Sequence, residues 1–378
     1  MSNAERLFAR AAVSALFLVN GFGMGVWAGA IAPLQTRLDL SPASLSLALL
    51  GMAAGAVVAM PLAPALAARL GGSGRAAAVG VFLYAPALIA PTLAQNLPTL
   101  VIATFVLGAF NGLMDVAMNA HGTVVERAWG GAIMSSLHAA WSCGGIAGAV
   151  FSGAALHAGM GASGLLLSAA AAALLVGAIA AGKLGAGDRT PSAGPVYRLP
   201  DLKLIGLSLV ALLGMLAEGA MIDWSALYLT LVARAPSDLA AGGYGVFAGA
   251  MFAGRLIGDA AVQAAGRARV VAFGAGLAAV GVALVVIWPA TAVVFAGYAL
   301  MGVGLANVVP IVFSQSAARA ASPAAGVAMA ATVGYAGLML GPVLIGAAAG
   351  VFSLRVGFAL IAAALAAIVA IELRARQT

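Results

Sequence analysis

The chain has 378 residues, of which 63% are hydrophobic and 8% charged, and its mean hydropathy is +1.10. Soluble globular domains carry far more charge, so this composition excludes a soluble protein and indicates an integral membrane protein. The formal net charge of +7 follows from the membrane topology argued below and does not indicate a nucleic-acid partner. A single cysteine, Cys143, excludes a disulfide within the chain.

Long apolar segments recur from one end of the chain to the other. Each is near or above the roughly 20 residues that a helix needs to cross a bilayer. Membrane β-strands are shorter and alternate in polarity, and the sequence does not show that alternation. We therefore predict an all-α membrane protein with twelve spans, at residues 9–34, 43–68, 76–95, 98–121, 132–157, 162–183, 203–232, 239–263, 269–288, 290–315, 325–350 and 353–373.

The least apolar stretch, residues 183–203, is rich in Gly, Pro and charge. It predicts a cytoplasmic linker at 185–201 between an N-terminal six-helix bundle, 1–184, and a C-terminal six-helix bundle, 202–378. Arg6 and Arg10 precede the first apolar run, as in a signal peptide. This run is longer than a signal core of about 7 to 15 residues, so we expect the first helix to be retained.

The Lys and Arg residues predict the orientation, because they concentrate in cytoplasmic loops. With a cytoplasmic N-terminus, all but three of the 18 basic residues fall on the cytoplasmic side. The exceptions are Arg37, Arg234 and Arg355. We expect a multi-pass protein of the bacterial inner (plasma) membrane with both termini in the cytoplasm.

The two halves share short sequence matches at a nearly constant offset. Residues 20–30 align with 218–228, and residues 112–115 align with 304–307. Further matches start at Leu50 and Ala248 and at Gly130 and Ala325. Matches in this order indicate a duplicated six-helix unit.

A Gly-, Asp- and Arg-containing motif lies between the second and third span of each half. The C-terminal copy comprises Gly254, Arg255, Gly258, Asp259 and Arg267, and the N-terminal copy comprises Arg69, Gly71 and Arg75, with Ala68 where an acid is expected. With this motif and the duplication, the chain resembles the major facilitator superfamily (MFS) over nearly its whole length, and a bacterial branch near the sugar-permease-like members. The resemblance implies two bundles, a midplane substrate site between them, alternating access, and a cytoplasmic gate at the motif residues.

The fourth span carries Asn111, Asp115 and Asn119 four residues apart, so they share one stripe of the helix. His121 lies on another face, whereas His138 on the fifth span is placed to meet Asp115. An acid in a membrane span is costly and should face a partner or a cavity. Two interpretations stay open: a hydrogen-bond network that ties the two helices together, and a proton relay or substrate-binding face that includes Trp141 and Ser142.

The seventh span carries Glu218 and Asp223, which point about 140° apart on an unbroken helix. We expect Glu218 to be a cavity carboxylate, with a structural hydrogen bond as the alternative. For Asp223, a role in an outer gate and a packing contact between helices stay equally open. Because burial disfavours a charged carboxyl group, Glu218 or Asp115 could bind a proton on one side of the membrane and release it on the other.

Amides and aromatic residues at middle depths complete the expected lining of the cavity. They are Asn20, Trp27, Asn111, Trp141, Asn307 and Tyr335. Such groups suit a sugar-like or other small polar solute. We place Arg255 near the cytoplasmic end of its span, so that no basic residue lies in the central third of any span. This predicts a neutral or cationic solute.

The expected function is secondary active transport of a small polar solute by alternating access, coupled to protons. The alternatives are multidrug or amphiphile efflux by proton antiport, and a lipid-moving or transport-dead receptor relative. The expected partners are the solute, protons and the lipid bilayer, and the protein is expected to be a monomer. The three histidines lack metal-ligand spacing, and no catalytic constellation is present, so we expect no metal, no cofactor and no enzymatic activity.

Overall fold

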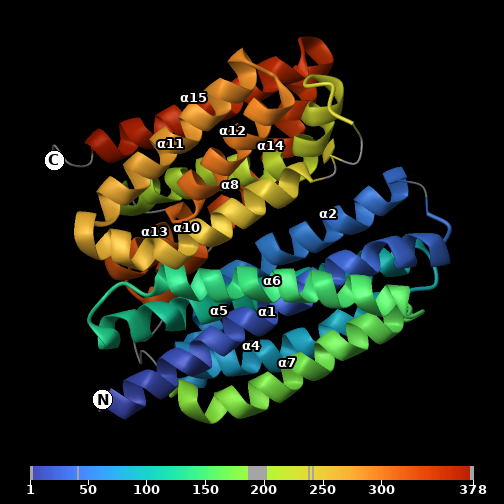
Figure 1. Cartoon of the computed structure of the whole chain (residues 1–378). Coiled ribbons are helices and arrows are strands. Elements are labelled where there is room, and N and C mark those ends of the chain that lie inside the picture. Colours follow the sequence, from blue (N-terminus) through green and yellow to red (C-terminus); the bar gives the residue numbers. More distant parts are fainter. Residues whose placement is uncertain (1–2, 41, 186–201, 237–238, 241, 375–378) are drawn as a thin grey trace. The chain divides into compact units, whose positions relative to one another are not determined.

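The computed structural model describes residues 3–40, 42–185, 202–236, 239–240 and 242–374, and these form helices without any strand (Figure 1). The helices are α1 (Asn3–Arg37), α2 (Pro42–Ala59), η1 (Met60–Leu62), α3 (Ala63–Leu70), α4 (Ser73–Ile89), η2 (Ala90–Leu93), α5 (Leu97–Trp129), α6 (Met134–His157), α7 (Ala162–Leu184), α8 (Leu202–Leu231), α10 (Gly243–Ala265), α11 (Arg267–Ile287), α12 (Thr291–Leu305), α13 (Val308–Arg319), α14 (Pro323–Val351) and α15 (Leu354–Arg374). The all-α prediction is therefore confirmed.

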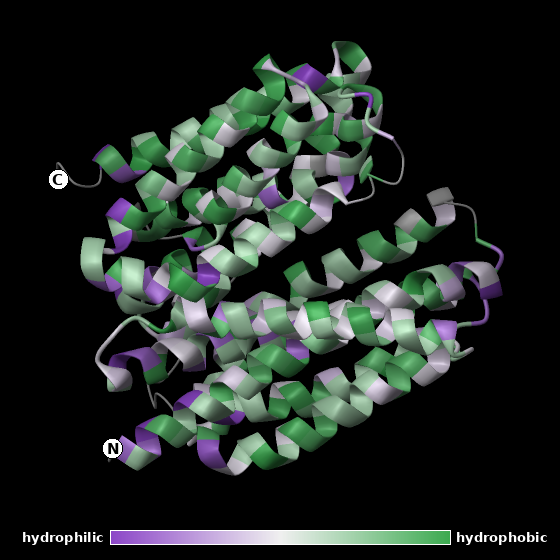
Figure 2. Ribbon diagram, viewed as in Figure 1, coloured by the Kyte–Doolittle hydropathy of each residue, from purple (hydrophilic) through white to green (hydrophobic). Residues whose placement is uncertain are grey.

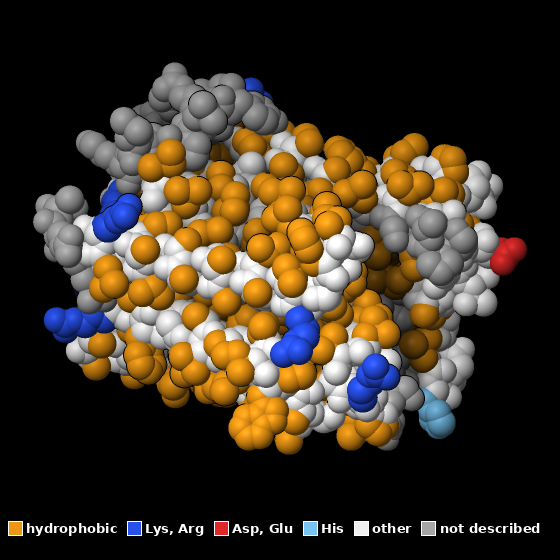
Figure 3. Space-filling model, turned by 90° about the horizontal axis from the view of Figure 1, so that it is seen from above, with side chains coloured by type: hydrophobic (Ala, Val, Ile, Leu, Met, Phe, Trp, Pro, Cys, Tyr) orange, Lys and Arg blue, Asp and Glu red, His pale blue; other side chains and the backbone are white. Residues whose placement is uncertain are grey.

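Twelve helical segments of the described residues are long and apolar enough to cross a membrane, as predicted. Apolar residues dominate the helices, and polar residues gather mainly toward helix ends and loops (Figure 2). On the face drawn in Figure 3, apolar side chains predominate and the Lys and Arg side chains are few and scattered. Such a surface suits contact with lipid acyl chains.

Three of the predicted spans are not single helices. The second consists of α2, η1 and α3, the third of α4 and η2, and the tenth of α12 and α13. Pro61 and Pro64 lie in the first turns of η1 and α3, and Pro310 lies in the first turn of α13. Proline has no N–H, so none of these residues can donate the hydrogen bond that one continuous helix through the span would need, and hydropathy does not register this.

The fourth span is longer than predicted. α5 has 33 residues, so it is about 50 Å long, whereas the hydrocarbon core of a bilayer is roughly 30 Å thick. The Asn96 side chain accepts a hydrogen bond from the Thr99 N–H at the start of α5, and Gly130 closes its end in the left-handed conformation, with φ 82°. The polar residues of α5 are thus held on one rigid, capped helix.

α1 and α6 approach each other through glycines on both helices. A Cβ at Gly21 would overlap the Trp141 carbonyl, and one at Gly144 would overlap the Leu18 carbonyl. Small residues allow this approach between membrane helices. The contact places Asn20 of α1 beside Trp141 of α6.

Two arginines expected on the outer side bind carbonyl groups at helix ends. Arg37 donates to the carbonyl oxygens of Thr92 (2.6 Å) and Ala94 (3.0 Å), beyond α4. The Arg355 Nε donates to the Val286 carbonyl oxygen (3.1 Å), near the end of α11. Each arginine satisfies carbonyls that a terminating helix leaves without partners.

The described residues form two compact units. The first contains those within 1–130, 137–198 and 317–329, and the second those within 131–136, 199–316 and 330–378. Residues 186–201 of the predicted linker lie outside the described residues. The division into bundles 1–184 and 202–378 stays a prediction.

Candidate functional site

An amide on α5 joins the acid and the histidine that the sequence predicts to meet. The Asn119 Nδ2 donates to the Asp115 Oδ1 (3.2 Å) and to the Asp115 backbone oxygen (2.9 Å). The Asn119 Oδ1 lies 3.0 Å from the His138 Nε2. Because Asp115 offers acceptors, the amide NH₂ must face it, and the Asn119 oxygen must then accept from His138. His138 therefore carries a proton on Nε2.

Three helices hold the His138 side chain. Asn119 comes from α5, His138 itself from α6, and Phe17 of α1 packs against the imidazole with ring centroids 5.3 Å apart. Asn119 and His138 are buried, and Asp115 is partly buried. Ser142, a predicted site residue, donates its hydroxyl to the His138 backbone oxygen (3.1 Å), as serines in helices commonly do.

A second hydrogen-bonded cluster surrounds Asn20 in the same unit. The Asn20 Nδ2 donates to the Asn111 Oδ1 (2.9 Å), and the Trp141 Nε1 donates to the Asn20 Oδ1 (2.9 Å). The Tyr84 hydroxyl donates to the Asn20 backbone oxygen (3.2 Å). α1, α4, α5 and α6 are thus linked at one level. Tyr84 is a contributor that the sequence analysis missed, because a lone tyrosine in an apolar span gives no signal.

The predicted stripe on α5 therefore serves two separate sets of partners. Asn111 binds Asn20 of α1, whereas Asp115 and Asn119 connect to His138 of α6. The reason is that neighbouring helices meet α5 at different heights, which residue spacing within one helix does not reveal.

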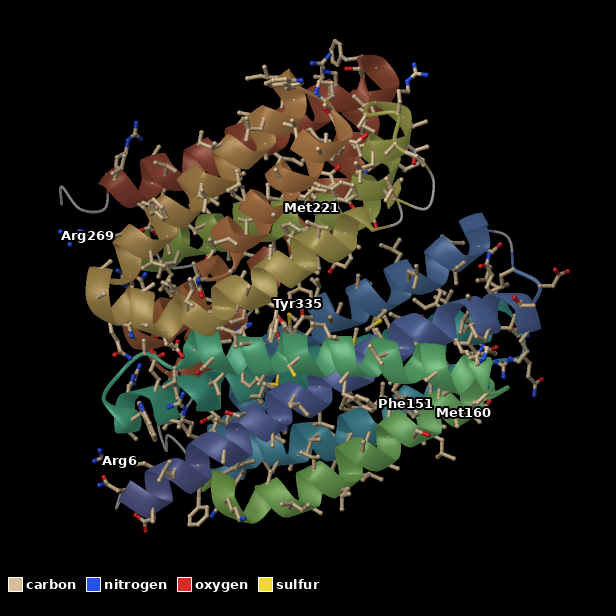
Figure 4. All side chains as sticks on the ribbon, viewed as in Figure 1. Arg6, Phe151, Met160, Met221, Arg269 and Tyr335 are labelled. Carbon is tan, nitrogen blue, oxygen red and sulfur yellow. The ribbon has the colours of Figure 1, made fainter. Side chains whose placement is uncertain are left out.

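The sequence also singles out His121, Trp27 and Tyr335. His121 is buried beside α4, with its Nδ1 3.4 Å from the Ser73 hydroxyl, so it faces away from the Asp115 chain as predicted. Trp27 is buried on α1. Tyr335 is half-buried on α14 (Figure 4).

In the second unit, the two acids of the seventh span occupy different surroundings. α8 is continuous from Leu202 to Leu231, so Glu218 and Asp223 do point in different directions. Glu218 is partly buried and interacts electrostatically with Arg255 and the Tyr244 hydroxyl of α10. Asp223 is exposed in the unit. Tyr244 is a second residue that the sequence analysis missed.

The predicted place of Arg255 is wrong. α10 runs from Gly243 to Ala265, so Arg255 lies at its centre, where only 5% of its surface is exposed. The predicted span, 239–263, begins before α10 does, and this places Arg255 too close to the cytoplasmic end. A basic residue does occupy the central third of a span, and its electrostatic interaction with Glu218 offsets part of the cost of burying its charge.

The motif residues of the C-terminal half make two kinds of contact. The Asp259 carboxylate accepts the backbone N–H groups of Ser135 (2.9 Å) and Ser136 (3.0 Å), which begin α6. A carboxylate at this position satisfies free N–H groups and opposes the helix dipole. Gly258 packs against the Asn307 side chain. Arg267 is exposed.

Asn307 and the residues of the N-terminal motif bind nearby backbone groups, end a helix or lie exposed. The Asn307 Nδ2 donates to the Gly254 carbonyl oxygen (3.1 Å), so this amide packs on α10. Gly71 ends α3 with φ 76°, and the Arg75 guanidinium donates to the Leu70 carbonyl oxygen (3.2 Å). Arg69 is exposed. A gating role for either motif stays a prediction.

Among the described residues, no group of His, Cys, Asp and Glu could hold a metal ion.

Comparisons with known proteins agree with the twelve-span helical fold. The model of the Major Facilitator Superfamily matches residues 13–335. An uncharacterized MFS-type transporter of Yersinia pestis is 36% identical over 92% of this chain and 90% of its own length. An uncharacterized transporter of Sinorhizobium fredii is 34% identical over 95% and 96%. The structure of FucP, the fucose:proton symporter of E. coli, superposes with a TM-score of 0.79 and 14% identity over 97% of this chain and 98% of that chain. At that identity the likeness to FucP concerns the fold.

Proposed function

Because the chain belongs to the Major Facilitator Superfamily, and is therefore a multi-pass inner-membrane transporter and not an enzyme, we propose that it moves a small polar solute together with protons. It acts as a secondary active transporter that alternates access to its site. The observation that carries this proposal is the Asp115–Asn119–His138 chain. The transporter works as a monomer.

Both ends of this chain can exchange a proton. An imidazolium donates from both ring nitrogens, so His138 can gain a proton and keep its hydrogen bond to Asn119. Asn119 also donates to the Asp115 backbone oxygen, so the amide stays in place when the Asp115 carboxyl group changes its charge. The three residues can therefore take up a proton and stay hydrogen-bonded to one another. A proton-coupled carrier must bind and release a proton in each cycle.

The Asn20 cluster supports a polar solute. Its amide groups offer donors and acceptors for hydroxyl groups, and Trp141 is half-buried, so part of its ring can stack on a solute. Arg255 is buried and interacts with Glu218, so it does not present an open positive charge to an anion. A neutral or cationic, sugar-like solute therefore stays our proposal.

The test is a thermal-shift screen of sugars, polyols, amines and drugs, followed by uptake of each hit into proteoliposomes with and without a pH gradient. We expect a polar solute to be taken up, with proton movement detected by an enclosed pH-sensitive dye. Asp115→Asn and His138→Gln should lower gradient-driven uptake at least about tenfold, in the range of ordinary coupling free energies. His121→Gln is the matched control, because His121 binds Ser73 instead.

If the Asp115→Asn and His138→Gln variants both kept wild-type uptake and its dependence on the pH gradient, the proposal would be contradicted. If only drugs and amphiphiles bind, and the protein exports them, the result would favour the efflux alternative. Movement of labelled lipid without any solute uptake would favour a lipid-moving relative.

A further inference from the structure

The tenth span contains a carbonyl group whose helical partner is missing. α12 ends at Leu305 and α13 begins at Val308. In a continuous helix the Ala306 carbonyl would accept a hydrogen bond from the residue four positions later, but that residue is Pro310, which has no N–H. The Arg255 Nε donates to the Ala306 carbonyl oxygen instead (3.2 Å). An arginine of the eighth span thus replaces the N–H that proline removes.

Further contacts hold this break against the middle of α10. The Asn307 Nδ2 donates to the Gly254 carbonyl oxygen (3.1 Å). Gly254 and Gly258 have no side chains that would obstruct the contact, since a Cβ at Gly254 would lie 2.7 Å from the Ala306 Cβ and one at Gly258 would overlap the Asn307 amide. α10 and α13 accordingly lie next to each other in Figure 1.

An acid of the seventh span offsets part of the cost of burying the Arg255 charge. Glu218 of α8 attracts the guanidinium, and the Tyr244 hydroxyl of α10 lies within electrostatic range of both groups. Other titratable groups occur on the helices packed against α8: Tyr298 on α12, Tyr335 on α14, and Arg355, Glu372 and Arg374 on α15. Tyr298 donates its hydroxyl to the Ser225 backbone oxygen (2.9 Å). A buried guanidinium that loses its counter-charge is strongly destabilised.

We propose that Arg255 is a positioning residue that couples the charge of Glu218 to the break in the tenth span. While Glu218 is ionised, the guanidinium stays on the Ala306 carbonyl and the break is closed. When Glu218 binds a proton, the guanidinium moves toward water, the carbonyl loses its donor, and the break loosens. This inference does not depend on the Asp115–Asn119–His138 chain, so the two can fail separately.

Hydrogen–deuterium exchange of the full protein in lipid nanodiscs tests this coupling without a known solute. The readout is amide exchange in peptides that cover residues 303–312, including the Ile311 N–H, which donates to the Asn307 oxygen (3.2 Å). At alkaline pH, Glu218→Gln and Arg255→Met should each raise this exchange about threefold or more over wild type. Arg269→Met is the matched control, because Arg269 is an exposed arginine at the start of α11 (Figure 4).

The pH dependence has a definite sign. As the pH falls, wild-type Glu218 becomes protonated, so wild-type exchange, corrected for its intrinsic rate, should approach that of Glu218→Gln. Arg255→Lys should partly restore protection, because it keeps the positive charge. In a Pro310→Ala background, the new N–H can bind the Ala306 carbonyl, so Glu218→Gln and Arg255→Met should no longer raise exchange.

Equal or slower exchange in Glu218→Gln at alkaline pH would overturn the coupling, even if Arg255→Met raised exchange. An equal effect of Arg255→Met with and without Pro310→Ala would overturn the assignment of Ala306 as the critical acceptor. If Arg255→Met does not fold, the Glu218→Gln, Arg255→Lys and Pro310→Ala comparisons still decide the question.

Discussion

Asn20 uses both ends of its side-chain amide, donating to Asn111 and accepting from Trp141. Side-chain hydrogen bonds between membrane helices contribute about 0.6 kcal/mol on average and up to about 1.7 kcal/mol. Because each partner is largely removed from water, loss of one member leaves another polar group unsatisfied. The Asn20 cluster should therefore behave as a unit.

A double-mutant cycle tests this unit. Asn20→Leu and Trp141→Phe should each destabilise the protein, and their combination should cost about 0.6 to 1.7 kcal/mol less than the sum of the single effects. The measurement is reversible unfolding in mixed micelles. Trp141→Phe keeps an aromatic ring and removes only the indole N–H and the second ring. Strict additivity would show that the hydrogen bond contributes nothing measurable.

Arg255 shows why the depth and the partners of an unusual residue are harder to predict from the sequence than its presence. The sequence marks it as an unusual charge in an apolar segment, which is a sound signal. Its depth depends on where α10 begins, and its function depends on Pro310 of another helix. Neither is contained in a motif. The same limit applies to Tyr84 and Tyr244, whose partners lie far along the chain.

At the scale of helices, apolar length was sufficient to predict twelve spans, since a bilayer sets one minimum length for all of them. The breaks within the second, third and tenth spans were missed. A hydropathy average treats proline as one residue among many, whereas the backbone loses a specific hydrogen bond. Helix contacts were also not predictable, because they depend on which glycines face a neighbour.

The α1–α6 contact offers a matched pair of glycines on α6. A Cβ at Gly144 would overlap the Leu18 carbonyl, whereas a Cβ at Gly153 would meet nothing within 4 Å. We expect Gly144→Ala to destabilise the protein by about 1 to 3 kcal/mol through overpacking. Gly153→Ala should be neutral or stabilising by up to about 1 kcal/mol, because alanine favours the helix. Thermal unfolding of both variants checks this, and equal effects would contradict the close contact.

At the scale of the whole molecule, the family and the number of spans follow from the sequence, while orientation in the membrane rests on charge alone. Lys and Arg bias predicts both termini on the cytoplasmic side. Arg37 and Arg355, two of the exceptions, bind helix-end carbonyls. Their predicted placement on the outer side therefore has a structural reason and does not weaken the charge argument.

Cysteine labelling tests the orientation in a Cys143→Ala background, which removes the only native thiol. Met160 lies in the turn between α6 and α7, and Arg269 near the start of α11, and both are exposed (Figure 4). With a cytoplasmic N-terminus, five spans precede Met160 and eight precede Arg269, so their sides differ. Met160→Cys in intact cells should react with a membrane-impermeant maleimide, and Arg269→Cys should react only after the membrane is opened. The reverse pattern would invert the topology and would place the Asp259 motif on the outer side.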